Sequence, residues 1–380
     1  MVPLPSSLDA ALARARQLYE RQAWQEAYDA LGSVDRQSSL GLEDLWRLTW
    51  CSGMCGRESD MLAALERVYH LAGEAEPLVA ARAAFWSGFR LLGMGEMSRA
   101  SGWLTRAERS IALAGCACVE QGYLLLPEVR RLFQLADYDA AYDAARRAEQ
   151  IGERFAERDL CVFARNLQGR VLLRQGALDA GLKLLDEVML SVVAGELSPG
   201  VTGLIYCSAI DTCQSVYAID RAREWTQALS RWCDAQPQMV NFTGACLVSR
   251  SEIMELGGQW PEALAEAGRA AQRFLDSFGP RATGEPRYRQ AEIQRLRGEL
   301  AAAEESYREA HQQGRDPQPG LALLRLAQGR PDAALAAIRR TANDATEPFK
   351  RARVLPALIE ILLANSALES RSRSAAVVMS

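Results

Sequence analysis

The feature of this sequence that most constrains its fold is a short phrase that recurs nine times along the 380 residues. Each copy starts with a turn residue, has an apolar residue two positions later, a small residue three after that, and an apolar residue four further on. The copies begin at Gln22, Gly56, Gly95, Ala136, Gly176, Asp220, Gly258, Gly298 and Gly329. Internal similarity at a period of roughly 40 residues indicates a repeat array.

A helical pattern of apolar residues precedes each copy, for example ARAAFWSGFRLLGM before Gly95. The unit is therefore helix, tight turn, helix, and the turn favours glycine because the first helix ends in a left-handed residue. Two copies have a large residue, Met61 or Trp225, at the position where a small residue is expected to open the second helix. In the other copies this residue, which lets the two helices approach closely, is Ala27, Ala100, Ala141, Gly181, Ala263, Ala303 or Ala334.

A single helix hairpin cannot bury its apolar stripe, so neighbouring hairpins must stack. The predicted fold is all-α, a right-handed superhelical solenoid of about nine stacked antiparallel helix hairpins over residues 8–365. The tail, residues 366–380, has little apolar periodicity and is expected to be disordered or frayed. Segments rich in Gly, Pro and polar residues are interpreted as loops between repeats; they lie at 73–77, 196–200, 234–238, 278–286 and 314–320.

Charge and hydropathy exclude several classes of partner. The net charge is -4 and the pI is about 5.6, so we expect no direct nucleic-acid binding by this chain. The N-terminus lacks a signal-peptide pattern and no run of 18 apolar residues occurs, which predicts a cytoplasmic protein with no membrane association. Nine cysteines without such a signal are expected to be reduced and mostly buried.

The repeated phrase, with a second small residue seven positions upstream at Gly88, Gly169 and Ala291, resembles the tetratricopeptide repeat. The longer units are similar to the repeat region of large bacterial LuxR-type transcriptional regulators related to the maltose regulator. This resemblance covers roughly residues 8–364 and is most specific in GLIYCSAIDTCQSVYAIDRAREWTQALSRWCDAQPQ. It implies the sensor part of such a regulator. The family's C-terminal helix-turn-helix domain is not expected in RSRSAAVVMS, so the chain is a truncated relative or a stand-alone repeat protein.

Motifs of catalysis, metal binding and cofactor binding are missing from the sequence. It contains neither GxSxG nor HExxH, and it has only two histidines. The pairs Cys51/Cys55 and Cys116/Cys118 lack the spacing of a zinc cluster. GALDAGLK, residues 176–183, nearly matches a phosphate-binding loop, but its lysine is one place late and no strand precedes it. We therefore predict a protein without catalytic residues, metal or cofactor, and keep an enzyme as the least favoured alternative.

The stretch 203–236 combines cysteines, acids and tryptophans and could be mistaken for an active site. Its apolar residues fall at helical spacing and are interpreted as packed core: Cys207, Ile210, Cys213, Val216, Tyr217, Trp225, Leu229 and Trp232. Asp211 and Gln214 are three residues apart, on one face between apolar positions. These two side chains are expected to face a groove.

In stacked hairpins the first helix of each unit lines the concave face, and the repeat register gives its non-packing residues. They are Arg82, Phe89, Tyr123, Arg130, Phe163, Asn166, Arg170, Arg174, Asp211, Gln214, Glu252, Glu255, Tyr288 and Glu292. Arginines come first and carboxylates later, which suits a protein or peptide partner that carries both charges; a small inducer is also considered. The alternatives are that these are solvated polar residues, or that the chain is a stand-alone adaptor.

Overall fold

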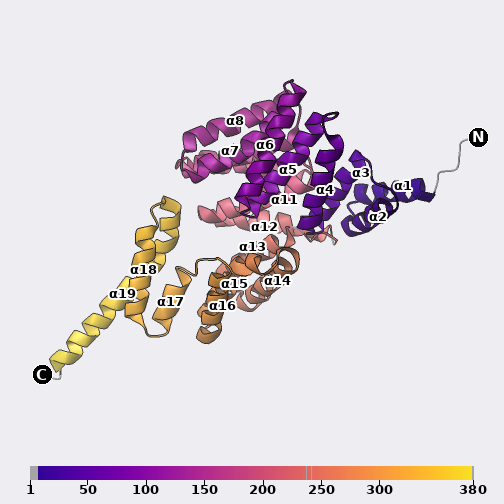
Figure 1. Ribbon diagram of the computed structural model, residues 1–380. Helices are drawn as coiled ribbons and strands as arrows, with labels where there is room; N and C mark the ends of the chain where they lie inside the picture. Colours follow the sequence, from indigo (N-terminus) through magenta and orange to yellow (C-terminus); the bar gives the residue numbers. More distant parts are fainter. Residues whose placement is uncertain (1–6, 237, 241, 379–380) are drawn as a thin grey trace, which may run out of the picture. The chain divides into compact units, whose positions relative to one another are not determined.

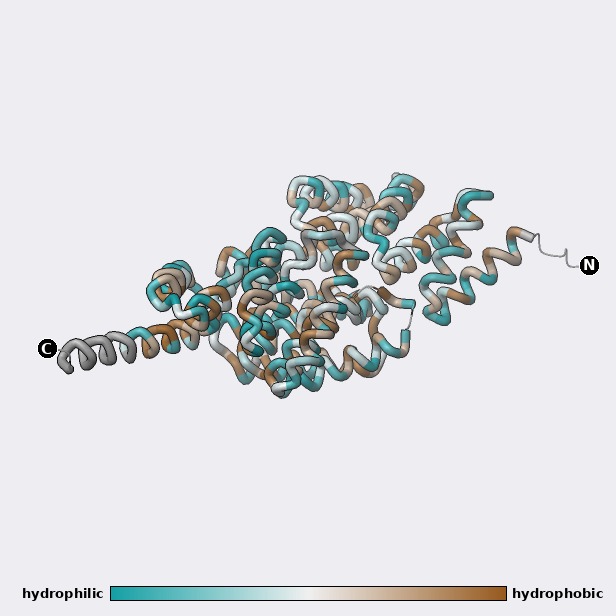
Figure 2. The backbone as a smooth tube through the Cα atoms, turned by 90° about the horizontal axis from the view of Figure 1, so that it is seen from below, coloured by the Kyte–Doolittle hydropathy of each residue, from teal (hydrophilic) through white to brown (hydrophobic). Residues whose placement is uncertain are grey.

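The computed structural model describes residues 7–236, 238–240 and 242–378, and in this part of the chain it contains nineteen α-helices and no β-strand. Hydrophobic and hydrophilic residues alternate in short bands along the helices, as amphipathic helices require (Figure 2). The chain divides into two compact units, Met1–Phe242 and Thr243–Ser380, here called unit 1 and unit 2. The all-helical prediction is confirmed.

Unit 1 consists of six helix hairpins in chain order (Figure 1). Their helices are α1 (Ser7–Glu20), α2 (Trp24–Gln37), α3 (Leu42–Met54), α4 (Glu58–Ala72), α5 (Pro77–Gly93), α6 (Met97–Ala114), α7 (Glu120–Gln134), α8 (Tyr138–Arg154), α9 (Arg158–Arg174), α10 (Leu178–Val193), α11 (Pro199–Ser215) and α12 (Ile219–Asp234). Each helix packs on its hairpin partner, and the hairpins stack on one another.

Unit 2 has three further hairpins and a final long helix (Figure 1). Its elements are α13 (Thr243–Leu256), α14 (Trp260–Phe278), the short 3₁₀ helix η1 (Pro280–Thr283), α15 (Gly284–Leu296), α16 (Leu300–Gln312), α17 (Gly320–Ala327), α18 (Pro331–Asp344) and α19 (Pro348–Val378). Helix α19 packs against α17 and α18 around a core that includes Ile338 and Ile361.

The turns of the nine hairpins have the left-handed geometry that the sequence predicted. One residue with positive φ ends the first helix of each hairpin: Gln22, Gly56, Gly95, Ala136, Gly176, Tyr217, Gly258, Gly298 and Gly329. In the sixth hairpin the prediction was wrong by three positions, because Tyr217 (φ 60°) and not Asp220 makes the turn. Ala222, which is fully buried, is then the small residue of that repeat, and Trp225 is an ordinary core residue.

Small residues let the two helices of a hairpin touch. The small residues predicted to open the second helices are all buried in the structure. A Cβ at Gly88 would lie 2.8 Å from Leu104 Cγ and 3.2 Å from the Ala100 carbonyl oxygen. In the second hairpin the roles are exchanged, because Met61 is accommodated by Gly53, where a Cβ would lie 2.7 Å from the Met61 sulfur. Helix contact therefore needs one small residue per crossing, on either helix.

Unit 1 closes on itself, since its first hairpins contact its last ones. Trp24 Nε1 donates a hydrogen bond of 2.9 Å to Gln236 Oε1 across 212 residues of sequence. Val240 N donates to the Met54 carbonyl oxygen at 2.9 Å, and helix α3 contacts α11. We call this contact between the first and last hairpins of unit 1 the seam. It makes residues from opposite ends of unit 1 neighbours.

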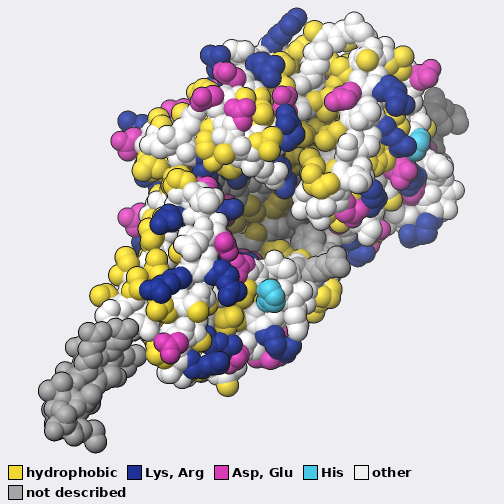
Figure 3. Space-filling view, turned by 60° about the vertical axis from the view of Figure 1, so that its left-hand side comes forward, with side chains coloured by type: hydrophobic (Ala, Val, Ile, Leu, Met, Phe, Trp, Pro, Cys, Tyr) yellow, Lys and Arg dark blue, Asp and Glu magenta, His cyan; other side chains and the backbone are white. Residues whose placement is uncertain are grey.

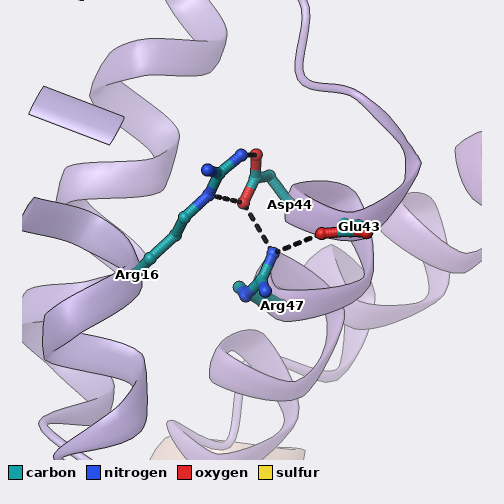
Figure 4. Close-up of polar contacts among 4 residues, drawn as sticks. All are labelled: Arg16, Glu43, Asp44 and Arg47. Carbon is teal, nitrogen blue, oxygen red and sulfur yellow. Dashed lines mark hydrogen bonds and ion pairs between the residues drawn. The ribbon is translucent and has the colours of Figure 1, made fainter. Parts of the chain in front are cut away.

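An ion-pair group joins the first two hairpins (Figure 4). Arg16 of α1 donates two hydrogen bonds to the Asp44 carboxylate of α3, from Nε at 2.9 Å and from Nη2 at 2.6 Å. Arg47 donates to Asp44 Oδ1 at 2.9 Å and also approaches Glu43. The arginines lower the pKa of Asp44, and this carboxylate is buried, so the pair fixes α1 against α3.

Helix α19 continues beyond residue 366, where the sequence predicted that a disordered or frayed tail begins. Its backbone is helical to Val378, beyond residue 366, while residues 379–380 lie outside the described part of the chain. A single array over residues 8–365, its right-handed superhelical form and the fraying of the tail all stay predictions.

Candidate functional site

The first helices of the hairpins in unit 1 lie side by side. Contacts join α5 to α7, α7 to α9, and α9 to α11. The candidate residues from Arg82 to Gln214 are therefore on four adjacent helices. Their environments divide them into two groups, one basic and partly open, the other buried and internally paired.

The first group, here called the basic cluster, is Arg130 of α7 with Arg170 and Arg174 of α9. Arg130 is exposed, and the other two are partly buried. The Arg170 and Arg174 guanidinium carbons lie 5.5 and 5.6 Å from the centre of the Phe133 ring, so both cations approach the same aromatic side chain. Sequence reasoning missed Phe133, although its position three residues after Arg130 on one helix was a usable signal.

Three positive charges lie close together in the basic cluster. Burial lowers the pKa of Arg170, and the neighbouring Arg174 and Arg130 lower it further, while the carboxylate of Asp211 on α11 opposes the shift. Asp211 itself is exposed, and Gln214, one helical turn later, is partly buried. A cationic group held beside two like charges gains from an added anion, so the cluster is suited to carboxylate or phosphate groups.

The second group centres on Arg82 and is internally paired. Arg82 forms ion pairs with Glu120 at 2.9 Å and Glu157 at 3.2 Å, and its guanidinium carbon lies 4.3 Å from the Tyr123 ring centre. The Tyr123 hydroxyl donates to Glu157 Oε1 at 2.6 Å, and Tyr123 is 1% exposed. This network links α5, α7 and the start of α9, so Arg82 and Tyr123 have a structural role.

Phe89, Phe163 and Asn166 lie close to this network. The Phe89 and Phe163 ring centres are 5.7 Å apart in an edge-on arrangement, which joins α5 to α9. Asn166 is fully buried, and its Nδ2 donates to Ser208 Oγ of α11 at 2.9 Å. These three side chains fill the space between the first helices. Whether any of them contacts a ligand stays a prediction.

The candidates in unit 2 belong to a charged network of that unit. Arg289 of α15 pairs with Glu252 of α13 at 3.2 Å and with Glu285 at 3.3 Å, and its side chain is 15% exposed. The Arg315 guanidinium lies 4.1 Å from the Tyr288 ring centre. Tyr307 donates a hydrogen bond to Glu292, which also pairs with Arg295 at 3.0 Å. Glu252, Tyr288 and Glu292 therefore have partners within unit 2.

Glu255 is the exception in this network. Its Oε2 is buried and has no hydrogen-bond partner among the described residues. Burial raises the pKa of Glu255 to about 7; Glu292 and Glu252 also raise it, while Arg289 lowers it. The carboxyl group is thus close to half-protonated near neutral pH.

Metal-binding, phosphate-binding and nucleic-acid-binding sites each have characteristic structural features. Within the described residues, no three or more His, Cys, Asp or Glu side chains are grouped so as to hold a metal ion. The phosphate-loop-like segment forms the turn of the fifth hairpin and the start of α10. Basic and acidic side chains are interspersed with hydrophobic ones on the face drawn in Figure 3. The absence of direct nucleic-acid binding stays a prediction.

One further structural finding concerns membranes. Across the described ranges, none of the helices combines the length and apolar character needed to cross a bilayer.

Comparison with known proteins supports the architecture. No family model and no curated protein sequence matches the chain. A Rap protein solved in complex with competence and sporulation factor has a TM-score of 0.50 at 12% identity, covering 93% of this chain and 97% of that chain. Aspartyl phosphate phosphatase F from Bacillus subtilis has a TM-score of 0.47 at 10% identity, covering 96% of each chain. The TPR domain of P58(IPK) has a TM-score of 0.27 at 13% identity, covering 95% of this chain and 99% of that chain.

These likenesses concern the fold alone. The likeness to the Rap protein agrees with the nineteen helices of the described residues and the repeated turn described above. The chain is a helical repeat solenoid of the tetratricopeptide-like kind.

Proposed function

We propose that this protein is a non-enzymatic scaffold that binds a protein or peptide partner through the basic cluster of unit 1. The observation that carries the proposal is the placement of Arg170 and Arg174 over the Phe133 ring, with the charges of Arg130 and Asp211 acting on Arg170. A partner segment with acidic groups next to an apolar side chain would complement both the charge and the ring.

The fold is compatible with such a role, because stacked helix hairpins present extended surfaces for binding. The Rap protein with the same architecture was solved with competence and sporulation factor bound. In the finer form of the proposal, which follows from the resemblance noted in the sequence, the chain is the sensor part of a LuxR-type regulator. A stand-alone adaptor or assembly factor is the alternative, and the identity of the captured partner would distinguish the two.

The test is affinity capture from the native host, quantified by mass spectrometry, with three forms of the protein. The first is the natural chain, and the second carries Arg170→Glu with Arg174→Glu. The third carries Arg109→Glu with Arg147→Glu, which makes the same charge change on exposed residues of α6 and α8. We expect the second form to capture its specific partner at least about tenfold less well, and the loss to resemble the effect of high salt.

Thermal unfolding separates binding from folding. We expect the melting temperature of the Arg170/Arg174 variant to stay close to that of the natural chain. If it falls, Arg170→Gln with Arg174→Gln replaces it as the test, because the neutral variant avoids placing a carboxylate beside Asp211. Equal capture by all three forms, or equal loss in both double variants, would show that the basic cluster is not the binding surface.

A further inference from the structure

A cavity of about 300 Å³ lies at the seam of unit 1. Gln22, in the turn between α1 and α2, forms one side of it, and residues of α10, the following loop, α11 and α12 form the rest. The apolar wall consists of Val192, Val193, Leu197, Pro199, Ala228 and Trp232. This volume is at the lower end of the range for small-molecule sites, which combine apolar side chains with a few polar groups.

Tyr206 supplies a polar group inside this cavity. Its side chain is 3% exposed and lines the cavity, and its hydroxyl forms no hydrogen bond to any other described residue. The hydroxyl oxygen is accessible from the cavity, so it can donate a hydrogen bond to water or to a ligand there. Burial raises the pKa of Tyr206, so the hydroxyl is a hydrogen-bond donor at neutral pH.

Arg231 supplies a positive charge at the mouth of the cavity. It is an exposed residue of α12 that also lines the cavity, and its charge acts on the Tyr206 hydroxyl. No carboxylate of the described residues forms an ion pair with it. Trp232, the next residue, places its ring 5.9 Å from the Tyr206 ring, centre to centre. Sequence analysis interpreted Trp232 as packed core, whereas the structure shows it as a cavity wall.

We propose that this cavity binds a small monocarboxylate with an apolar body. The carboxylate accepts hydrogen bonds from the Arg231 guanidinium and the Tyr206 hydroxyl, while the apolar part lies against Trp232, Val192 and Leu197. A guanidinium and a hydroxyl that line one cavity can each donate a hydrogen bond to a carboxylate oxygen. This site is separate from the basic cluster and does not depend on the proposed scaffold function.

Binding here would also act on the seam. Gln22 lines the cavity and lies in the turn just before Trp24, whose indole donates to Gln236 across the seam. A ligand in the cavity would contact both sides of the seam.

The test uses isothermal titration calorimetry on the full chain with two matched pairs of probes. These are phenylacetate against 2-phenylethanol, and hexanoate against 1-hexanol, which differ in the charged oxygen group. We expect saturable binding of at least one acid, and binding of its alcohol at least about tenfold weaker, since a charged hydrogen bond is worth more than that factor. Failure of both acids to bind at about 10 mM, or equal binding of acid and alcohol, would overturn the proposal.

Three variants assign the binding to these residues. Arg231→Gln should weaken acid binding about tenfold or more, and Tyr206→Phe, which removes only the hydroxyl, by a smaller factor. Arg273→Gln, a change at an exposed arginine of unit 2, should leave it unchanged. Circular dichroism shows whether each variant is folded. Acid binding that survives Arg231→Gln in a folded protein would refute the site even if the natural chain binds the acids.

Discussion

Glu255 offers the sharpest test of the electrostatics of unit 2. Its carboxyl group is held among Glu252, Glu292 and Arg289, with a buried oxygen that has no partner among the described residues. The rise of its pKa from 4.5 to about 7 means that folding opposes ionisation. Because one pKa unit corresponds to about 1.4 kcal/mol, ionised Glu255 costs unit 2 about 3 kcal/mol of stability.

The direction in which the stability of unit 2 changes with pH follows from proton binding by Glu255. Between pH 4.5 and 7 the folded protein holds this proton while the unfolded chain releases it, so the stabilising effect of protonation is complete below pH 4.5 and is lost as the pH rises through 7. Glu255→Gln keeps the side chain neutral, and Arg289 still has Glu252 and Glu285 as partners. We expect the variant to be more stable than the natural chain by about 3 kcal/mol at pH 8 and by about 1 kcal/mol at pH 5.

The assay is urea denaturation at several pH values, read by hydrogen exchange in α13 and α15 so that unit 2 is followed by itself. Glu360→Gln, an exposed position of α19, is the control and should show no such trend. A Glu255→Gln variant that is less stable at pH 8, or whose difference from the natural chain is the same at pH 5 and pH 8, would refute the reasoning.

Three further outcomes are expected. Asp44→Asn should destabilise unit 1 by about 2 kcal/mol near neutral pH, as measured by urea denaturation, because it weakens the paired contact with Arg16. Since the pKa of Asp44 is lowered from 3.8, this difference should vanish as the pH falls below that range. Gly320→Ala should lower the melting temperature of unit 2, because the added methyl group would overlap the Glu292 carboxylate. In maleimide labelling followed by mass spectrometry, exposed Cys116 should react first, whereas Cys213, whose pKa burial raises to about 12, should react only on unfolding.

The fold was predictable because its signals are local. A left-handed residue at the end of a helix favours glycine, and a close helix crossing needs a small side chain, so eight of the nine turns could be placed from the sequence. The sixth turn was misplaced because Tyr217 occupies the left-handed position. A tyrosine does not favour that backbone conformation, so the sequence does not indicate a turn there. Likewise, the presence of Met61 in place of a small residue is explained only by Gly53 on the opposite helix.

The candidate site was less predictable because it depends on contacts between hairpins. The period of the repeats placed Arg130, Arg170 and Arg174 on adjacent helices, as the structure has them. It could not show that Arg82 pairs with Glu157 across 75 residues. Nor could it show the pairing of Glu252 with Arg289, for which the register of two neighbouring hairpins must be known. The side chains that the pattern assigned to one open face thus include buried ion pairs as well as the more open basic cluster.

The bond between Trp24 and Gln236 has a consequence for how the protein is made. Repeat arrays can fold progressively, since each repeat needs only its neighbour. Here the partner of Trp24 emerges from the ribosome 212 residues later, a delay of roughly 10 to 40 s at ordinary rates of translation. During that interval the surface of the first hairpin that contacts the last hairpins is exposed to solvent. The nascent chain therefore depends on the later hairpins, or on a chaperone, to cover this surface.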